Sequence, residues 1–272
     1  MICFLDESSA RDVLVAGGKA AALAKLIAED FPIPEGFIVT TPREPDLPAY
    51  LDAIEHRIAP NSVFAVRSSG YSEDSAGSSF AGQYETVLGV RGLEAVSIAI
   101  TRCFASFSNA RSAVYRASCA TEIQGGAVIV QRLVDADAAG VTFTADPVTG
   151  ARDRICIEAN FGLGDSVVGG HVNPDGFTVI RETGEIAERR IAEKHVRSVL
   201  ISGGSLLEPM PEGLAGKACL PDAAVHEVAG IASRVEEHFG RPVDIEWAWK
   251  DGKIWLLQAR AITRSMPVKC KR

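Results

Sequence analysis

Apolar and polar residues alternate along residues 241–260, on both sides of Asp251-Gly252. Alternation with a period of two is typical of half-buried β-strands, and Asp-Gly between two such runs indicates a β-hairpin. One face of this hairpin is apolar and is expected to pack on a core, whereas the other carries charged and amide side chains. The polar face therefore either meets water or lines a functional site.

The turn decides which polar residues share a face, because a slip of one residue moves every side chain of a strand to the other side. With a two-residue turn, Glu246 and Gln258 would lie on opposite faces. With a three-residue turn that has Gly252 in the left-handed conformation, Asp244 would lie opposite Gln258. Only this second register gathers carboxylate, amide and the Arg260 guanidinium on one face, so we predict a three-residue turn.

Such a face suits a metal ion and a phosphate. Carboxylate and amide oxygens are suitable ligands for Mg²⁺, which is usually held by one or two protein groups together with substrate phosphates. An arginine beside them, here Arg260, can bind phosphate oxygens through its planar fork. The simpler interpretation is a hairpin surface whose charges are solvated.

Two stretches nearer the N-terminus also suggest anion binding. A glycine pair precedes an alanine-rich run, so Lys19 is expected in the first turn of a helix, where free N–H groups favour anions. An apolar strand ends at Arg67 and is followed by a loop of serine and glycine residues that reaches Gly82. Backbone N–H groups of such a loop can approach a polyphosphate closely, with Arg67 adding charge. Neither a Walker A sequence nor G-x-G-x-x-G occurs in the chain.

The apolar strand around residues 129–133 is a hinge candidate, where backbone groups could meet a purine ring. Gln131 interrupts this strand, and it is either a nucleotide-binding residue or an ordinary residue at a sheet edge. His171 lies in a later glycine-containing stretch and has no second histidine or cysteine close to it in the sequence. We therefore do not expect His171 to be a metal ligand or a catalytic base.

Composition limits the classes of function. A chain of 272 residues with 47% hydrophobic residues can bury a sizeable core. The formal net charge of −7 and the isoelectric point near 5.3 argue against a nucleic-acid partner. The six cysteines have no metal-site spacing and are typical of reduced thiols, and no apolar stretch approaches membrane-spanning length. The expected location is the cytoplasm, without a membrane partner.

Four separated stretches resemble one family. They are Gly17-Gly-Lys-Ala20, Ala65-Val-Arg-Ser-Ser69 with Ser79-Phe-Ala-Gly-Gln-Tyr-Glu-Thr86, Gly140-Val-Thr-Phe-Thr-Ala-Asp-Pro-Val-Thr-Gly150, and Asp244-Ile-Glu-Trp247 with Leu257-Gln-Ala-Arg260. In this order they resemble the N-terminal nucleotide-binding domain of phosphoenolpyruvate synthase and pyruvate phosphate dikinase, shared with rifampin phosphotransferase. The resemblance implies an α+β, two-lobed ATP-grasp fold with the nucleotide cleft between the lobes. We expect the lobes at residues 1–120 and 121–272.

The resemblance also implies roles for individual residues. In the family, the residues that match Lys19, Arg67, Glu246, Gln258 and Arg260 handle the phosphates of ATP and Mg²⁺. Carried over, Lys19, Arg67 and Arg260 are the expected catalytic residues, and Glu246 and Gln258 are the expected Mg²⁺ ligands. Gly82 of the small-residue loop and Gln131 of the hinge strand complete the predicted ATP-binding set.

Members of the family move the β-phosphoryl group of ATP to a histidine on a separate swivelling domain and release AMP. The 12 residues after Arg260 leave no room for such a domain in this chain. We therefore expect the histidine on a partner polypeptide or a detached carrier domain, and the small-molecule acceptor is not identified. Two alternatives stand: a stand-alone ATP-dependent kinase or ligase that acts directly on a small molecule, and a non-catalytic nucleotide-binding module.

Overall fold

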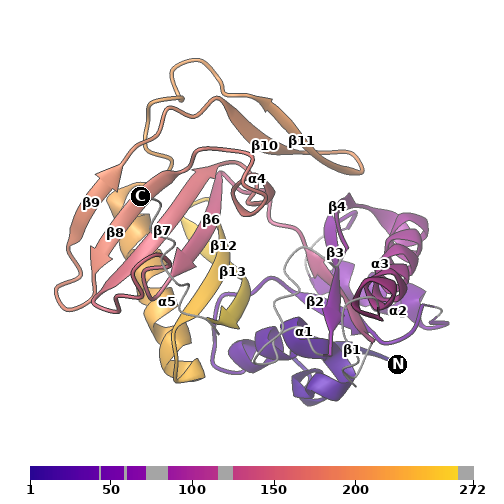
Figure 1. Ribbon diagram of the computed structural model, residues 1–272. Helices are drawn as coiled ribbons and strands as arrows, with labels where there is room; N and C mark the ends of the chain where they lie inside the picture. Colours follow the sequence, from indigo (N-terminus) through magenta and orange to yellow (C-terminus); the bar gives the residue numbers. More distant parts are fainter. Residues whose placement is uncertain (43, 58–59, 72–84, 116–124, 263–272) are drawn as a thin grey trace. The chain divides into compact units, whose positions relative to one another are not determined.

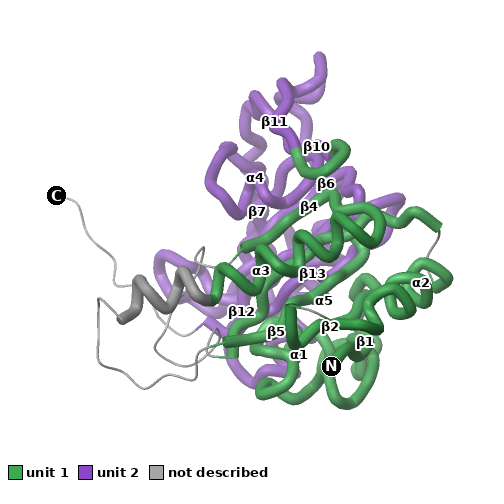
Figure 2. Tube along the Cα trace, turned by 90° about the vertical axis from the view of Figure 1, so that its right-hand side faces the viewer, with its two compact units in different colours: residues 1–133, 201–205 green, residues 134–200, 206–272 purple. Residues whose placement is uncertain are grey.

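The chain divides into two compact units, which Figure 2 colours separately. The computed structural model describes residues 1–42, 44–57, 60–71, 85–115 and 125–262. Unit 1 comprises Met1–Leu133 with Ile201–Ser205, and unit 2 comprises Val134–Leu200 with Leu206–Arg272. Each unit has its own antiparallel sheet and its own helices (Figure 1), so the predicted α+β class is confirmed.

Unit 1 is built on a five-stranded sheet. Its strands are β1 (Ile2–Phe4), β2 (Gly36–Val39), β3 (Phe64–Gly70), β4 (Thr86–Val90) and β5 (Gly126–Arg132). They lie in the order β1-β2-β5-β3-β4, and every neighbouring pair is antiparallel. The expected division after residue 120 placed the strand β5 in the second lobe, whereas the structure has it in the middle of the unit 1 sheet.

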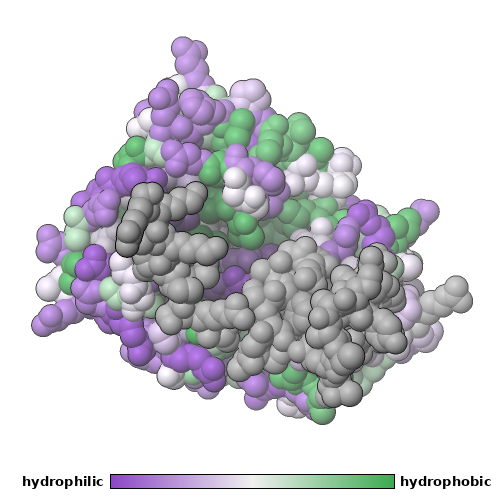
Figure 3. Space-filling view, viewed as in Figure 1, coloured by the Kyte–Doolittle hydropathy of each residue, from purple (hydrophilic) through white to green (hydrophobic). Residues whose placement is uncertain are grey.

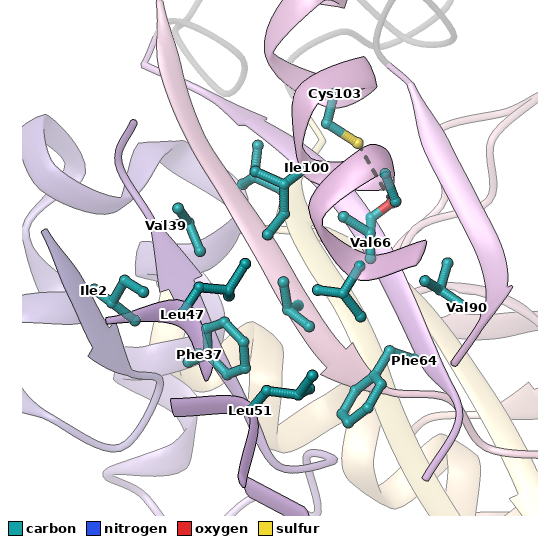
Figure 4. Close-up of a cluster of buried hydrophobic side chains, with 14 of the residues drawn as sticks. Ile2, Phe37, Val39, Leu47, Leu51, Phe64, Val66, Val90, Ile100 and Cys103 are labelled. Atoms are coloured by element: carbon teal, nitrogen blue, oxygen red, sulfur yellow. Dashed lines mark hydrogen bonds between the residues drawn. The ribbon is translucent and has the colours of Figure 1, made fainter. Parts of the chain in front are cut away.

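Helices cover both faces of this sheet. They are η1 (Ser8–Arg11), α1 (Val13–Ile27), α2 (Leu47–Arg57) and α3 (Gly92–Tyr115). The face toward α2 and α3 carries the apolar core in Figure 4, in which Phe37, Phe64 and Val66 pack with Leu51 and Ile100. The opposite face receives α1. Because side chains alternate along a strand, the core-facing positions of β3 leave Arg67 and its neighbours at i±2 on the α1 face.

Unit 2 is built on a six-stranded antiparallel sheet. Its strands are β6 (Ala138–Phe143), β7 (Arg154–Phe161), β8 (Asp175–Ile180), β9 (Ile186–Arg190), β12 (Val243–Lys250) and β13 (Lys253–Ala261), in the order β13-β12-β6-β7-β8-β9. A short helix α4 (Asp165–Val168) lies in the connection between β7 and β8, and the long helix α5 (Asp222–Phe239) precedes β12. The α5 helix lies along one face of the sheet (Figure 1) and buries Val225, Val228 and Val235 there.

Different contacts mark the two ends of α5. Gly240 follows the helix in the left-handed conformation, with φ of 67°, a common way for a helix to end. Pro221 occupies the N-cap position, and Asp222 is the first helical residue. The Asp222 carboxylate accepts hydrogen bonds from Arg189 on β9 at 2.8 and 3.2 Å. This pairing links the first turn of α5 to β9.

A separate two-stranded hairpin, β10 (Val196–Ile201) and β11 (Gly204–Pro209), follows β9. It exposes the apolar residues Ile201, Leu206 and Leu207, and hydrophobic atoms gather in the part of Figure 3 where this hairpin lies in Figure 1. Within the described part of the chain, none of the helices is both long enough and apolar enough to cross a membrane.

Candidate functional site

The turn between β12 and β13 has two residues, so the predicted three-residue turn is wrong. Lys250 pairs with Lys253, and Asp251 and Gly252 both have positive φ, 50° and 76°. This is the combination that a two-residue turn of the primed type requires, and aspartate tolerates the left-handed conformation better than most residues. The Asp137 carboxylate also supports the turn, because it accepts from Lys250 Nζ at 2.7 Å and from the Asp251 N–H at 3.1 Å.

A β-bulge restores the shared polar face that the turn alone would lose. Trp247 pairs with Leu256, but the preceding residue Glu246 pairs with Gln258, so Leu257 is an extra residue in β13. An extra residue in one strand moves the side chains of the residues after it to the opposite face of the sheet. Since directly opposite residues of an antiparallel pair point to the same side, Glu246 and Gln258 share one face. The predicted gathering of the polar groups is confirmed, although a bulge causes it.

Asp244 and Arg260 form the next pair on this face. They lie directly opposite each other, and Arg260 Nε is 2.8 and 2.6 Å from the two carboxylate oxygens of Asp244. The expected pairing of Asp244 with Gln258 is therefore wrong. Asp244 was absent from the predicted site, although its position two residues before Glu246 places it on the same face. Its carboxylate orients the Arg260 guanidinium, whose side chain remains 44% exposed.

Glu246 and Gln258 are suitable ligands for a divalent cation. Both side chains are half-buried, and directly opposite residues have Cα atoms about 4.5–5.5 Å apart, so their oxygens can converge on one ion. Among the described residues, no group of three or more His, Cys, Asp or Glu side chains could hold a metal. A carboxylate with an amide is nevertheless a sufficient donor set for Mg²⁺, which takes most of its remaining ligands from phosphates and water.

The other face of the hairpin is fixed by burial. Trp247 is fully enclosed, and its indole Nε1 donates to Thr142 Oγ1 at 2.8 Å. At the start of β12, Thr144 Oγ1 accepts from the Val243 N–H at 2.9 Å, and the Thr144 N–H donates to the Val243 carbonyl at 3.0 Å. These bonds tie β12 to the end of β6 and to the segment that follows it. They hold Asp244 and Glu246 on a rigid strand.

A second network joins the C-terminal end of α5 to the same region. Glu236 accepts from Arg152 at 3.0 Å and from Arg181 at 2.7 Å. Burial by itself would raise the pKa of Glu236, but hydrogen bonds from Arg152, Thr144 and Arg181 outweigh it and lower this pKa. Arg181 also donates to the Thr144 carbonyl at 2.6 Å. Helix α5 is thereby fixed next to the strand that carries Asp244 and Glu246.

In unit 1, the glycine pair before Lys19 allows α1 to approach β3 closely. Gly17 has φ of 75°, and a Cβ there would lie 2.0 Å from the Ser69 carbonyl oxygen. The Ala20 N–H donates to Ser69 Oγ at 3.1 Å. Lys19 is thus in the first turn after a kink at Gly17, and α1 itself begins earlier, at Val13. Since Arg67 lies two residues before Ser69, its side chain is on the same face of β3.

Lys19 and Arg67 are half-buried and lie near buried polar groups of unit 1. Burial raises the pKa of the Cys103 thiol to about 11, and the Lys19 charge opposes this effect. Ser68 Oγ, adjacent to Arg67 in sequence but on the other face of β3, donates to the Cys103 carbonyl at 3.2 Å. Lys19 on α1 and Arg67 on β3 thus lie on elements of unit 1 that are in contact. That they form one anion site stays a prediction.

Of the two other predicted nucleotide-binding residues, Gln131 and Gly82, the structure describes only Gln131. Gln131 is on the central strand β5, paired with Gly36 and with Ala65, so the alternative of a sheet-edge residue is wrong. It is buried, and its Nε2 donates to the Pro34 carbonyl at 2.9 Å. Gly82 lies outside the described residues. His171 is exposed.

Comparison with known proteins identifies the family. Residues 44–271 match the family described as pyruvate phosphate dikinase, AMP/ATP-binding domain. A probable phosphoenolpyruvate synthase of Methanothermobacter thermautotrophicus is 33% identical over 314 residues, which cover 96% of this chain and 46% of the relative. Prodigiosin synthesizing transferase PigC of Serratia marcescens is 37% identical over 286 residues, 93% of this chain and 32% of the relative. Rifampicin phosphotransferase of a Streptomyces species is 38% identical over 232 residues, 84% and 26% of the two chains.

This chain thus spans less than half of the length of these relatives. Among solved structures, the dinucleotide forming acetyl-coenzyme A synthetase 1 of Ca. Korarchaeum cryptofilum has a TM-score of 0.48 and 12% identity, with 90% of this chain and 92% of that chain covered. The family match agrees with the ATP-grasp fold that the resemblance implied. The chain belongs to the pyruvate phosphate dikinase AMP/ATP-binding domain family.

Proposed function

We propose that this chain binds ATP with Mg²⁺ and passes a phosphoryl group to a histidine on a separate carrier domain or partner protein, with AMP as a product. The family description supports nucleotide binding, and relatives named as phosphoenolpyruvate synthase and rifampicin phosphotransferase support phosphoryl transfer. The relatives are longer than this chain, which supports an acceptor on additional domains.

The observation that carries the proposal is the polar face of the β12–β13 hairpin. A carboxylate, an amide and an oriented guanidinium are displayed there in two adjacent cross-strand pairs, Glu246 with Gln258 and Asp244 with Arg260. A hairpin that served only as a surface would not need a bulge to bring these groups to one side. Phosphoryl transfer requires mainly positioning and charge neutralisation, which such a face supplies.

Each residue then has a distinct task. Glu246 and Gln258 would hold Mg²⁺, which when bound neutralises phosphate charge. Arg260, held by Asp244, binds a phosphate oxygen in a fixed orientation because its Nε is already engaged. Lys19 and Arg67 of unit 1 would add positive charge at the phosphates of ATP, and we propose Gln131 and Gly82 as further nucleotide-binding residues.

In the proposed transfer, an imidazole nitrogen of the carrier histidine bonds to the β-phosphorus of ATP. The bond between this phosphorus and the oxygen that bridges to the α-phosphate breaks, and AMP leaves with that oxygen. Water then breaks the bond between the terminal phosphate and the β-phosphorus. Inorganic phosphate is released, and the β-phosphoryl group stays on the histidine. The small-molecule acceptor that later takes the phosphoryl group is a matter for the carrier and its further domains.

The test uses titration followed by isotope transfer. Mg-ATP is titrated into the purified chain by calorimetry, and ATP labelled at the β- or the γ-phosphorus is then incubated with the chain and an extract of the source organism. We expect binding below about 1 mM, the upper end of ordinary KM values. We also expect AMP only when extract is present, and β-label on a protein as acid-labile phosphate. ADP as the product would contradict the proposal in favour of a stand-alone kinase, and no binding would contradict it altogether.

A further inference from the structure

An ion pair between Lys194 and Asp175 is completely enclosed in unit 2. Lys194 Nζ lies 2.7 Å from Asp175 Oδ1, and both side chains have no exposed surface. The Asp175 carboxylate also accepts from the backbone N–H groups of Ala192 at 2.9 Å and Cys219 at 2.8 Å. Replacing such a pair by well-packed apolar residues is often neutral or stabilising, because burial of the charges offsets their attraction. Stability alone therefore does not account for it.

Lys194 contacts a residue at each end of one loop. Residues 162–174 connect β7 to β8 and contain α4. Asp175 is the first residue of β8, directly after the loop, and Phe161 is the last residue of β7, directly before it. Lys194 Nζ lies 5.7 Å from the centroid of the Phe161 ring, within the range of a cation–π contact. A single ammonium group thus holds the entry and the exit of the loop.

The segment around Lys194 continues this contact along the start of the loop. We call residues 192–198 the strap. The Val196 carbonyl in the strap accepts from Asn160 Nδ2 at 3.0 Å, and the Ser198 carbonyl accepts from the Leu163 N–H at 2.8 Å. Gly162 approaches so closely that a Cβ there would lie 2.0 Å from the Ser198 oxygen. Two carbonyls of the strap, two residues apart, therefore accept hydrogen bonds from the end of β7 and from the start of the loop.

The loop in turn packs on the polar face of the sheet, beside the proposed metal ligands. The Cβ position of Gly164 lies 3.4 Å from Ala139 Cβ. Ala139 is paired with Ala248, two residues along β12 from Glu246 and on the same face. As diagonal neighbours across the two strands, Ala139 and Glu246 have Cα atoms about 7–8 Å apart. The strap, the loop and the proposed Mg²⁺ face form one continuous set of contacts within unit 2.

We propose that Lys194 and Asp175 are positioning residues that fix loop 162–174 at the border of the nucleotide site. The inference rests on the proposed function, because it assigns the loop to the same site. Lys194 and Asp175 touch no reacting atom in this role, since both are enclosed. They act through the position of the loop, which packs through Gly164 on Ala139 of the polar face.

The test replaces the ion pair by apolar residues of similar size, in the double variant Lys194→Met with Asp175→Leu. Amide hydrogen exchange is measured over residues 162–174 and over the sheet strands, together with the Tm and the Kd for Mg-ATP. The matched control is Arg189→Gln with Asp222→Asn, which removes a partly exposed ion pair, 2.8 Å long, between β9 and α5 of the same unit. A second variant, Phe161→Leu, removes the aromatic ring and leaves both charges in place.

We expect the double variant to have a lower Tm, because the buried N–H groups of Ala192 and Cys219 lose their acceptor. It should exchange about tenfold faster in loop 162–174 but not in the sheet strands, and bind Mg-ATP about tenfold more weakly. Phe161→Leu should give a smaller change of the same kind, about threefold, and the control should give none. Unchanged loop exchange in the double variant, or in Phe161→Leu if the double variant does not fold, overturns the inference. So does faster exchange that is spread evenly over unit 2, which indicates a purely structural pair. If the wild type does not bind Mg-ATP, the proposed function fails, whereas the exchange data still decide whether the pair fixes the loop.

Discussion

Glu246 and Trp247 are consecutive residues of β12, and they belong to opposite faces of the same sheet. Trp247 is fully enclosed on the side that α5 covers, and its indole is hydrogen-bonded to Thr142. Glu246 is half-buried on the other side and lies opposite Gln258. One face is held together by burial and the other displays polar groups that contribute little to folding. The difference teaches that stability and proposed chemistry can be changed separately in this strand.

The largest expected effect is on the apolar face. Trp247→Ala should lower the free energy of unfolding by about 3–5 kcal/mol, because it leaves a large cavity and deprives Thr142 Oγ1 of its donor. Denaturant unfolding of the purified variant measures this. Trp255→Ala is the matched control, since Trp255 is half-buried, pairs with Ala248 on the polar face and has Lys253 Nζ 3.7 Å from its ring centroid. Equal losses for the two variants would break the comparison between the faces.

The next effect concerns the polar face. Glu246→Gln should reduce nucleotide turnover about a hundredfold or more, because it removes the negative charge of a proposed metal ligand, and such losses correspond to about 3 kcal/mol of transition-state stabilisation. The free energy of unfolding should change by no more than about 0.5 kcal/mol. Product chromatography and denaturant unfolding on the same sample separate the two effects.

Glu158→Gln serves as the control for this variant. Glu158 is a 46% exposed carboxylate on β7, separated from Glu246 by Val141 in the same row of the sheet. We expect it to keep wild-type turnover. An equal loss in both variants would mean that general charge on this face matters, and that Glu246 has no special role.

A third prediction tests the network behind the hairpin through pH. The lowered pKa of Glu236 means that its stabilising contribution is present above the ordinary glutamate value near 4.3 and is lost as the pH falls through the lower, folded value. Glu236→Gln should cost about 2 kcal/mol at pH 7, since charge-assisted hydrogen bonds to Arg152 and Arg181 are lost. The difference from the wild type should shrink below about pH 4. Its neighbour Glu237, which is exposed, provides Glu237→Gln as the control; a constant difference at all pH values would argue against the network.

The smallest expected effect is in unit 1. Lys19→Ala should weaken Mg-ATP binding about fivefold to tenfold, the contribution of about 1 kcal/mol that is typical of one cation at a partly exposed anion site. Calorimetric titration measures the change. Lys25→Ala, an exposed position on the same helix, should bind as the wild type does. Unchanged affinity in Lys19→Ala would remove this residue from the site and leave the proposed chemistry with unit 2.

Much of the candidate site could be read from local patterns, and the exceptions share one cause. Alternation around Asp251-Gly252 predicted the hairpin, and the glycine pair predicted Lys19 in the first turn of a helix, although α1 begins earlier, at Val13. The prediction of a three-residue turn was wrong because it assumed that the turn alone sets the strand register. The bulge at Leu257 changes that register. No composition signal marks Leu257 as the extra residue, because a leucine fits a regular strand equally well.

Long-range pairing accounts for the other differences. Gln131 was open to interpretation as an edge residue until β5 paired with both β2 and β3. Asp244 was expected opposite Gln258, whereas the bulge pairs it with Arg260, 16 residues later. Lys194 and Asp175 are 19 residues apart, so no local pattern in the sequence pairs them.

The sequence by itself determined where strands and turns lie, which faces are apolar, and to which family the chain belongs, because these follow from local alternation, turn chemistry and matching motifs. Only the tertiary structure decided which residues oppose one another. The bulge that turns Gln258 and Arg260 toward Glu246 and Asp244, the central place of β5, and the enclosure of Lys194 with Asp175 all depend on pairing between distant segments. Such pairing is set by the packing of whole faces, and that information is distributed over the chain.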